Sequence, residues 1–307
     1  MKHFPFHLLL LAAAITLASC SGDTPGEDTL PAIGFTTQTT DTRAVVESPA
    51  DMTAFQVWGW YGTTASLTNV FNGDEVRHTG NAWTYDVPRY WIPGQTYNFY
   101  ALHPYGLNGA TCKDDGTLTI TDFTCGAGDN ATDLMTARAT GLNGSDAPVV
   151  NLTFSHELVR ITVDIKSDIT TEFKQLRLIN VPSAATFTKA ADGTTAWSNL
   201  TYHTPFLPTP GTSHNISAGG EFTNVFGTLL VIPKPDVNAK PQLHLVYQDE
   251  KAGTYQTKDI ELPNTDQWAA GQSYRYTCTI TGAQSQLNIY YTVTDWTGKE
   301  INVPDFK

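Results

Sequence analysis

Apolar and polar residues alternate with period two along most of the chain after residue 32. The clearest example runs from 159 to 166, where valine and isoleucine alternate with polar residues in Val-Arg-Ile-Thr-Val-Asp-Ile-Lys. This alternation predicts a half-buried strand with one face against a core. No segment of ten residues shows a convincing helical period, so the pattern predicts strands almost everywhere.

Further segments rich in β-branched and aromatic residues are separated by Gly, Pro and Asn, which favour turns. These predicted strands are 33–37, 55–61, 82–87, 97–102, 117–123, 149–154, 173–179, 225–232, 243–248, 254–262, 274–280 and 287–293. Their spacing predicts an all-β protein built from β-sandwiches. Because 307 residues exceed the usual size of a single domain, we expect two tandem domains, 33–155 and 156–307.

An apolar run at 4–17 ends in the tetrapeptide Leu-Ala-Ser-Cys, whose cysteine is Cys20. The run is too short to span a bilayer, so residues 1–19 are predicted to be an export signal. The small residues before Cys20 predict a lipoprotein signal with lipid on that cysteine, followed by a polar, turn-rich tether at 20–32. If Cys20 belonged to an ordinary cleaved signal instead, the mature protein would carry no lipid.

The composition is that of an extracytoplasmic β-rich protein, with 16% charged and 11% aromatic residues. The formal net charge is −12, and we find no local basic patch. A polyanion would therefore be repelled, which excludes nucleic acid as a partner.

The remaining cysteines are Cys112, Cys125 and Cys278. Cys112 and Cys125 flank a short loop and a predicted strand, and a disulfide between them would be compatible with an oxidising compartment. Sequence separation does not show whether their Cα atoms come close enough, so the disulfide and two free thiols remain alternatives. Cys278 lies in phase with apolar neighbours, which predicts a buried free thiol.

The sequence contains no pattern that predicts an enzyme. His156-Glu157 begins like a zinc-protease helix, but Arg160 stands where the second histidine would be required. The aspartates between 114 and 133 could bind Ca²⁺, although solvated loops explain them better. We therefore predict no catalytic residues, no metal site and no cofactor.

Trp58 and Trp60 are out of phase with the other apolar residues of segment 55–61. Both faces of that strand are therefore apolar. A strand covered on both sides explains this pattern, and the alternative is an aromatic platform on which a sugar ring stacks. The second interpretation would make the protein a monomeric glycan-binding lipoprotein of the outer surface.

Several motifs together resemble the fimbrillin family of Bacteroidetes, and the resemblance runs from the signal to the C-terminus. They are Phe55-Gln56-Val57-Trp58-Gly59-Trp60-Tyr61, Tyr90-Trp91, Tyr97-Asn98-Phe99-Tyr100-Ala101-Leu102-His103-Pro104, Asp133-Leu134-Met135-Thr136-Ala137, Phe154-Ser155-His156-Glu157-Leu158-Val159-Arg160-Ile161, the segment 268–276 and Val293-Thr294-Asp295-Trp296. The resemblance implies a subunit of a lipoprotein-derived (type V) pilus with two transthyretin-like β-sandwich domains. It also implies a lipid-anchored precursor in the outer membrane and a surface fimbrium after processing.

In that family an arginine-specific protease releases the first strand, and Arg43, followed by Ala44, matches this cleavage site. The resemblance further implies that another subunit then donates its C-terminal strand. In this chain the apolar donor positions would be Leu287, Ile289, Tyr291 and Val293.

The expected partners are therefore other pilus subunits, together with a host or bacterial surface ligand for an adhesive subunit. A stalk, a tip and an anchor remain alternatives, and the same strand could instead be an integral part of the second domain.

Overall fold

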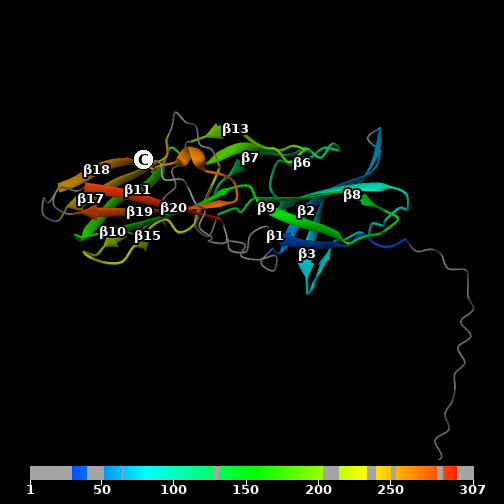
Figure 1. Ribbon diagram of the computed structural model, residues 1–307, viewed down its shortest axis with the longest axis horizontal. Coiled ribbons are helices and arrows are strands. Elements are labelled where there is room, and N and C mark those ends of the chain that lie inside the picture. The colour runs from blue at the N-terminus through cyan, green and yellow to red at the C-terminus, as the bar shows by residue number, and fades with distance from the viewer. Residues whose placement is uncertain are drawn as a thin grey trace, which may run out of the picture.

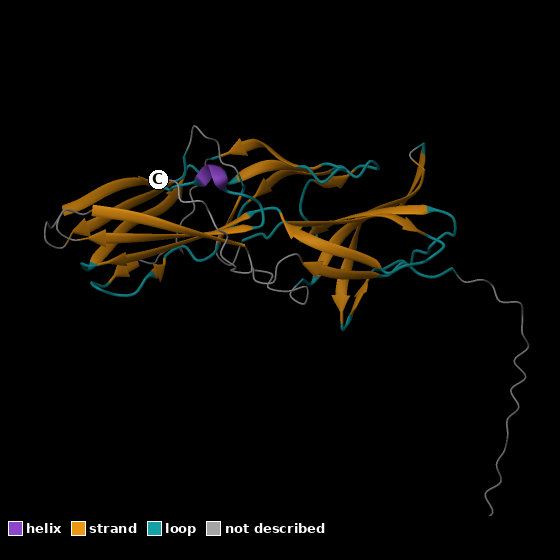
Figure 2. Ribbon diagram, viewed as in Figure 1, coloured by secondary structure: helices purple, strands orange, loops and turns teal. Residues whose placement is uncertain are grey.

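The computed structural model describes residues 30–39, 52–63, 65–126, 131–202, 214–233, 240–249, 254–281 and 286–295. Among these residues the regular elements are strands, apart from one short 3-10 helix at Thr265–Gln267 (Figure 2). The prediction of an all-β fold without long helices is therefore confirmed for the described part of the chain.

The N-terminal half is built on a seven-stranded sheet with the order β1-β9-β8-β5-β2-β3-β4 (Figure 1). Its strands are β1 (Phe35–Thr39), β2 (Ala54–Thr63), β3 (Ser66–Thr79), β4 (Ala82–Thr84), β5 (Thr96–His103), β8 (Met135–Asn143) and β9 (Val150–His156). β1 and β9 are parallel, whereas the other pairs of this sheet are antiparallel.

This sheet curls around its own aromatic core. β1 and β3 are five positions apart in the strand order, which would separate them by about 24 Å in a flat sheet. The rings of Phe35 on β1 and Phe71 on β3 nevertheless lie 5.4 Å apart between centroids. The two ends of the sheet must therefore approach each other, and we call this curled sheet the N-terminal barrel.

A four-stranded sheet with the order β13-β12-β7-β6 covers the outer face of the barrel. Its strands are β6 (Ala110–Cys112), β7 (Leu118–Thr124), β12 (Ala184–Lys189) and β13 (Thr195–Thr201). This sheet combines strands from both sides of the domain boundary that we placed between residues 155 and 156. The two halves thus share one layer of structure.

The C-terminal half is a sandwich of two sheets with the orders β15-β10-β19-β20 and β14-β11-β17-β18, and β16 also pairs with β10. The strands are β10 (Val159–Ser167), β11 (Thr171–Ile179), β14 (His214–Ile216), β15 (Thr223–Asn224), β16 (Leu229–Val231), β17 (Gln242–Asp249), β18 (Thr254–Glu261), β19 (Gln272–Thr281) and β20 (Gln286–Asp295). The predicted alternation on β10 is confirmed, because Val159, Ile161, Val163 and Ile165 are all buried.

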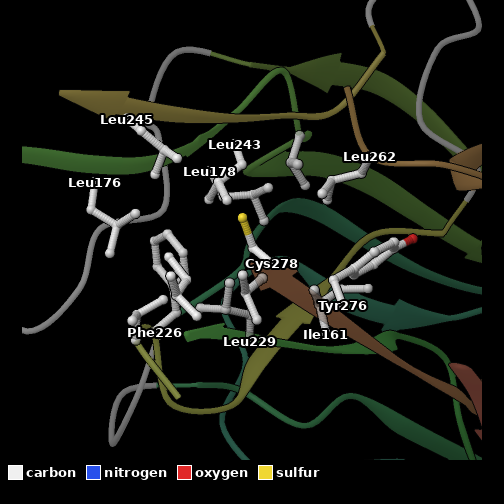
Figure 3. Packing of buried hydrophobic residues seen from close by; sticks show 14 of the residues in the cluster. Ile161, Leu176, Leu178, Phe226, Leu229, Leu243, Leu245, Leu262, Tyr276 and Cys278 are labelled. Carbon is white, nitrogen blue, oxygen red and sulfur yellow. The ribbon is translucent and has the colours of Figure 1, made fainter. Parts of the chain in front are cut away.

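The core of this sandwich is aliphatic around Cys278 (Figure 3). The thiol lies among leucine side chains such as Leu178 and Leu243, in agreement with the predicted buried free thiol. Burial raises the pKa of this thiol to about 12, which keeps it protonated and unreactive at neutral pH.

Some predicted strands were wrong in extent or were missed. The segment 225–232 contains a turn at Val225–Phe226, so it forms only the short strand β16 after β15. The predicted strand 82–87 ends at Thr84. β3, β6, β8 and β12 to β15 were not predicted. Several of these strands are only two or three residues long, polar residues interrupt the apolar pattern of the others, and β3 and β8 also contain an internal glycine.

Candidate assembly site

β1 stands at one end of the seven-stranded sheet and pairs with β9 along one edge, whereas the residues just before it bond to a second segment. On one side it pairs in parallel with β9, in a register that places Phe35 opposite Val150. On the other side Ala32 forms a β-bridge with Tyr90. The Ile33 N–H donates to the Arg89 carbonyl at 2.8 Å. Residues 32–39 together therefore complete the backbone hydrogen bonding of two neighbouring segments.

The side chain of Phe35 fills the centre of the aromatic core. Its ring makes edge-to-face contacts with Phe55, Phe71, Tyr85 and Phe99, with centroid distances of 5.4–5.9 Å. Such geometry adds stabilisation beyond the burial of apolar area. β1 is thus a structural part of the core.

A partly buried phenol also holds the residues directly before β1 in place. The Tyr85 hydroxyl donates to the Ile33 carbonyl at 2.6 Å. Burial raises the pKa of Tyr85, so the phenol keeps the proton that it donates. Because Tyr85 follows β4, this bond connects β1 to the opposite end of the sheet.

The residues predicted to be processed lie outside the described part of the chain. These residues are Cys20, Arg43 and Ala44. Their neighbours are described, however: β1 ends at Thr39, and the chain is described again from Met52, which is fully buried. Residues 40–51, which contain Arg43, therefore connect β1 to the rest of the barrel.

The predicted donor strand is β20, and its backbone pairs antiparallel with β19 over ten residues of the same chain. It stands at the end of the strand order of its sheet. The side chains of Leu287, Ile289, Tyr291 and Val293 lie outside the described part. Within the described strands, β20 pairs along one edge only.

Cys112 and Cys125 are free thiols in the structure, so the disulfide that the sequence left open is not formed. Cys112 pairs with Leu118 across the β6–β7 hairpin, whereas Cys125 follows the far end of β7. Seven residues of extended strand separate Leu118 from Cys125, about 23 Å, which is far beyond the reach of a disulfide. Burial raises the pKa of both thiols to about 12.

The aromatic platform predicted as an alternative is wrong. Trp58 and Trp60 are only 3% and 7% exposed, because the β6–β7–β12–β13 sheet covers the outer face of β2. The interpretation of a strand covered on both sides is confirmed. These two tryptophans therefore offer no surface on which a sugar ring could stack.

Buried polar residues connect the two halves where β9 is followed by β10. The Glu157 carboxylate accepts hydrogen bonds from Thr136, from Lys189 at 2.7 Å and from Thr195 at 3.0 Å. Its side chain is 2% exposed. This charge is therefore compensated by groups from β8, β12 and β13, a junction that sequence reasoning missed.

A second buried pair lies beside this junction, where His156 Nδ1 is 2.9 Å from Asp133 Oδ1. His103 lies nearby and hydrogen bonds through Nδ1 to the Ala54 carbonyl at 2.9 Å. Burial lowers the pKa of His103, which favours the neutral imidazole. Both histidines belong to motifs of the resemblance, but nothing in the sequence alone showed that they would be adjacent.

A cavity of about 350 Å³ lies where β8 and β9 separate beyond their two paired residues. Arg138 and Lys189 are among the residues that line it. Arg138 donates to the carbonyls of Ala191 and Asp192, and Lys189 is paired with Glu157. The cavity walls therefore carry cations that already have protein partners.

The described residues include no cluster of three or more His, Cys, Asp or Glu side chains that could hold a metal ion. Among the same residues, no helix has the length and apolar character needed to cross a membrane.

A curled sheet that ends in its first strand, joined to a β-sandwich, defines a two-part all-β protein. The fimbrillin-like family matches residues 42–296. Because this match covers most of the chain, the protein belongs to the fimbrillin-like family, and the resemblance inferred from its motifs is confirmed. No curated protein matches the sequence.

Three solved structures with a similar fold come from Bacteroides species. A fimbrial protein from Bacteroides vulgatus is 19% identical, with a TM-score of 0.65, and the match covers 87% of this chain and 99% of that one. A candidate cell adhesion protein from Bacteroides uniformis is 20% identical, with a TM-score of 0.54 and coverages of 89% and 100%. A similar protein from Bacteroides ovatus is 15% identical, with a TM-score of 0.53 and coverages of 90% and 99%.

Proposed function

We propose that this protein is a structural or adhesive subunit of a surface pilus. It is exported as a lipoprotein through its signal, anchored in the outer membrane by lipid on Cys20, and assembled by strand exchange. Cleavage between Arg43 and Ala44 starts this exchange. Membership of the fimbrillin-like family supports a pilus subunit or adhesin.

The observation that carries the proposal is the position of β1. It is a five-residue strand that completes the barrel, and residues 40–51, with Arg43 among them, link it to β2. Cleavage in this link would leave β1 attached to the barrel by non-covalent contacts alone. The discarded piece would carry Cys20 and its lipid.

Loss of β1 would uncover apolar side chains and a row of unpaired backbone groups along β9. Exposed strand edges of this kind pair readily with another chain, and unpaired buried backbone groups are costly. An extended segment from a second subunit would satisfy both demands, because its backbone completes the sheet and its alternate side chains fill the pockets.

We assign the donor role to β20, whose apolar positions are Leu287, Ile289, Tyr291 and Val293. β20 lies at a sheet edge, so its release breaks one ladder of hydrogen bonds rather than two. If β20 remained paired with β19, the subunit could still accept a strand, as a tip does, but could not donate this one. The tryptophans that suggested a glycan-binding lipoprotein are buried, so we propose no second function.

The test is brief digestion of the purified mature protein with an arginine-specific protease, followed by N-terminal sequencing and size-exclusion chromatography. A single new terminus at Ala44 together with higher oligomers is the expected result. An Arg43→Ala variant serves as the control and should remain intact and monomeric. A wild-type protein that is cleaved at Arg43 and stays a stable monomer would overturn the proposal.

A further inference from the structure

An open position lies at Gly34, the residue directly before β1. Phe35 and Ile33 point into the core, and side chains alternate along a strand, so residue 34 faces outward. A Cβ placed on Gly34 would meet no atom within 4 Å. The backbone of Gly34 lies outside the left-handed region, so other residues can adopt its conformation.

Exposed apolar side chains border this open position. Val150 donates its N–H to the Gly34 carbonyl at 2.8 Å, so the preceding residue, Val149, lies beside Gly34. Tyr90 lies diagonally across β1, because it pairs with Ala32. Val149 is 55% exposed and Tyr90 is 48% exposed, and large apolar residues as exposed as these are few in the described chain.

Glycine is an unfavourable choice for holding a strand in place. It loses more backbone freedom than other residues when it becomes ordered, and it contributes no side chain to the sheet. β1 therefore fills the inner side of the barrel well through Phe35, but leaves the space beside Val149 unused on the outer side.

We propose that position 34 determines which strand the barrel retains. Gly34 keeps β1 displaceable, and the strand of a second copy places a larger outward side chain against Val149 and Tyr90. This inference rests on the proposed strand exchange. It adds the residue that favours the incoming strand of a second copy over β1.

The sequence of the proposed donor fits this role in every register that keeps its apolar positions inward. The residues between those positions are Asn288, Tyr290 and Thr292, and none of them is glycine or alanine. Whichever one replaces Gly34 brings a side chain into the open position. The occupant that we assign is therefore the C-terminal strand of another molecule of this protein.

The principal experiment compares wild type with Gly34→Val after cleavage at Arg43. Mass spectrometry of size-exclusion fractions measures release of the N-terminal peptide, and light scattering follows polymer growth. Valine adds a favourable β-residue and contacts Val149, so we expect release and growth to become about tenfold slower. Ala82→Val, on β4 of the same sheet, is the matched control and should behave like wild type.

A second variant tests the acceptor side. Val149→Ala should reduce the size or stability of the polymers while leaving the unfolding of the uncleaved monomer unchanged, because Gly34 offers no side chain for Val149 to contact. In a Val149→Ala background, Gly34→Val should lose most of its effect, as expected for residues that interact directly.

The outcomes separate this inference from the proposed function. Cleaved wild type that forms no polymers would overturn strand exchange and the inference with it. Polymerisation of Gly34→Val at the wild-type rate, alongside normal assembly of wild type, would overturn the inference alone.

Discussion

Two parallel strand pairs occupy corresponding places in the two halves of the molecule. In the N-terminal half β1 pairs with β9 over five residues, and in the C-terminal half β10 pairs with β19 over eight. In each half a first strand thus pairs in parallel with a late one. Both ladders are parallel, yet β10 makes more contacts with its surroundings than β1 does.

β10 is held at both ends and along both edges. The described chain continues from β9 into β10 and from β10 into β11, and β15 and β16 pair with its second edge. An ion pair between Asp164 on β10 and Arg275 on β19 joins the two parallel strands. β1 contains no charged residue and is linked to β2 through the segment that holds Arg43.

Under the proposed strand exchange, this difference means that a strand can be essential to a core and still be replaceable. β1 contributes Phe35 to the centre of the barrel, but a single cut would remove its covalent link. β10 contributes a similar apolar face and would survive such a cut. The proposed exchange would therefore depend on chain connectivity and edge contacts, rather than on how deeply a strand is buried.

The largest effect is expected for Phe35→Ala, which should lower the free energy of unfolding by about 3–5 kcal/mol through loss of a large buried ring. Urea unfolding monitored by tryptophan fluorescence would measure it. Thr36→Ala on the same strand should cost less than about 0.5 kcal/mol. A cost below about 1 kcal/mol for Phe35→Ala would show that β1 does not complete the barrel, and the contrast with β10 would fail.

The next effect concerns the junction between the halves. Lys189→Ala should destabilise the protein by about 2–3 kcal/mol, because it leaves the buried Glu157 carboxylate without its cation. Thermal unfolding would measure the loss. Adding Glu157→Gln should restore part of it by removing the uncompensated charge. If Lys189→Ala were neutral and the double variant less stable than either, the ion pair would not join the halves as the structure indicates.

The sequence predicted the all-β class and the family because both depend on local patterns. Alternation at 159–166 produces a strand in almost any sandwich, and β10 follows it closely. β3 was missed because Asn72-Gly73, a typical turn signal, lies inside a long strand that shifts its register nearby. Such irregularities depend on the partner strand, and local propensity does not contain that information.

The assembly site could be predicted only in part. Apolar alternation predicted that the region around Phe35 is a strand, but not that its partner would be β9, more than a hundred residues later. The shared sheet of β7 and β12 was missed for the same reason. Pairing between strands that are far apart in the sequence depends on the folded topology. The burial of Trp58 and Trp60 follows from the pairing of β7 with β12, whose sheet covers them.

A smaller effect is expected from pH, through His103 in the N-terminal half. Its pKa lies below the ordinary value of 6.5 mainly because it is buried; the hydrogen bond to Ala54 and the nearby Asp133 oppose this shift, and His156 adds to it. The folded state thus binds fewer protons than the unfolded state, so stability is fully present above pH 6.5 and falls as the pH drops towards the folded pKa. We expect a loss of about 1 kcal/mol.

Urea unfolding at a series of pH values between 7.5 and 5 would reveal this loss, and His103→Gln should flatten that part of the curve. Stability that increases on acidification over the same range, in wild type but not in the variant, would contradict the assigned direction of the pKa shift.

The smallest effect is expected from reduction, because no disulfide joins the three cysteines that the structure describes. Because Cys112, Cys125 and Cys278 are free thiols, a reducing agent should change the free energy of unfolding by less than about 0.5 kcal/mol, whereas loss of a disulfide between Cys112 and Cys125 would cost about 3 kcal/mol. Their raised pKa values predict slow alkylation of the folded protein at pH 8 and rapid alkylation in urea. Mass spectrometry after alkylation in urea without reductant should find all three thiols modified. If only Cys278 were modified, and if Cys112→Ser made Cys125 reactive, the result would contradict this prediction. It would show that a disulfide between Cys112 and Cys125 supports the sheet that covers the barrel.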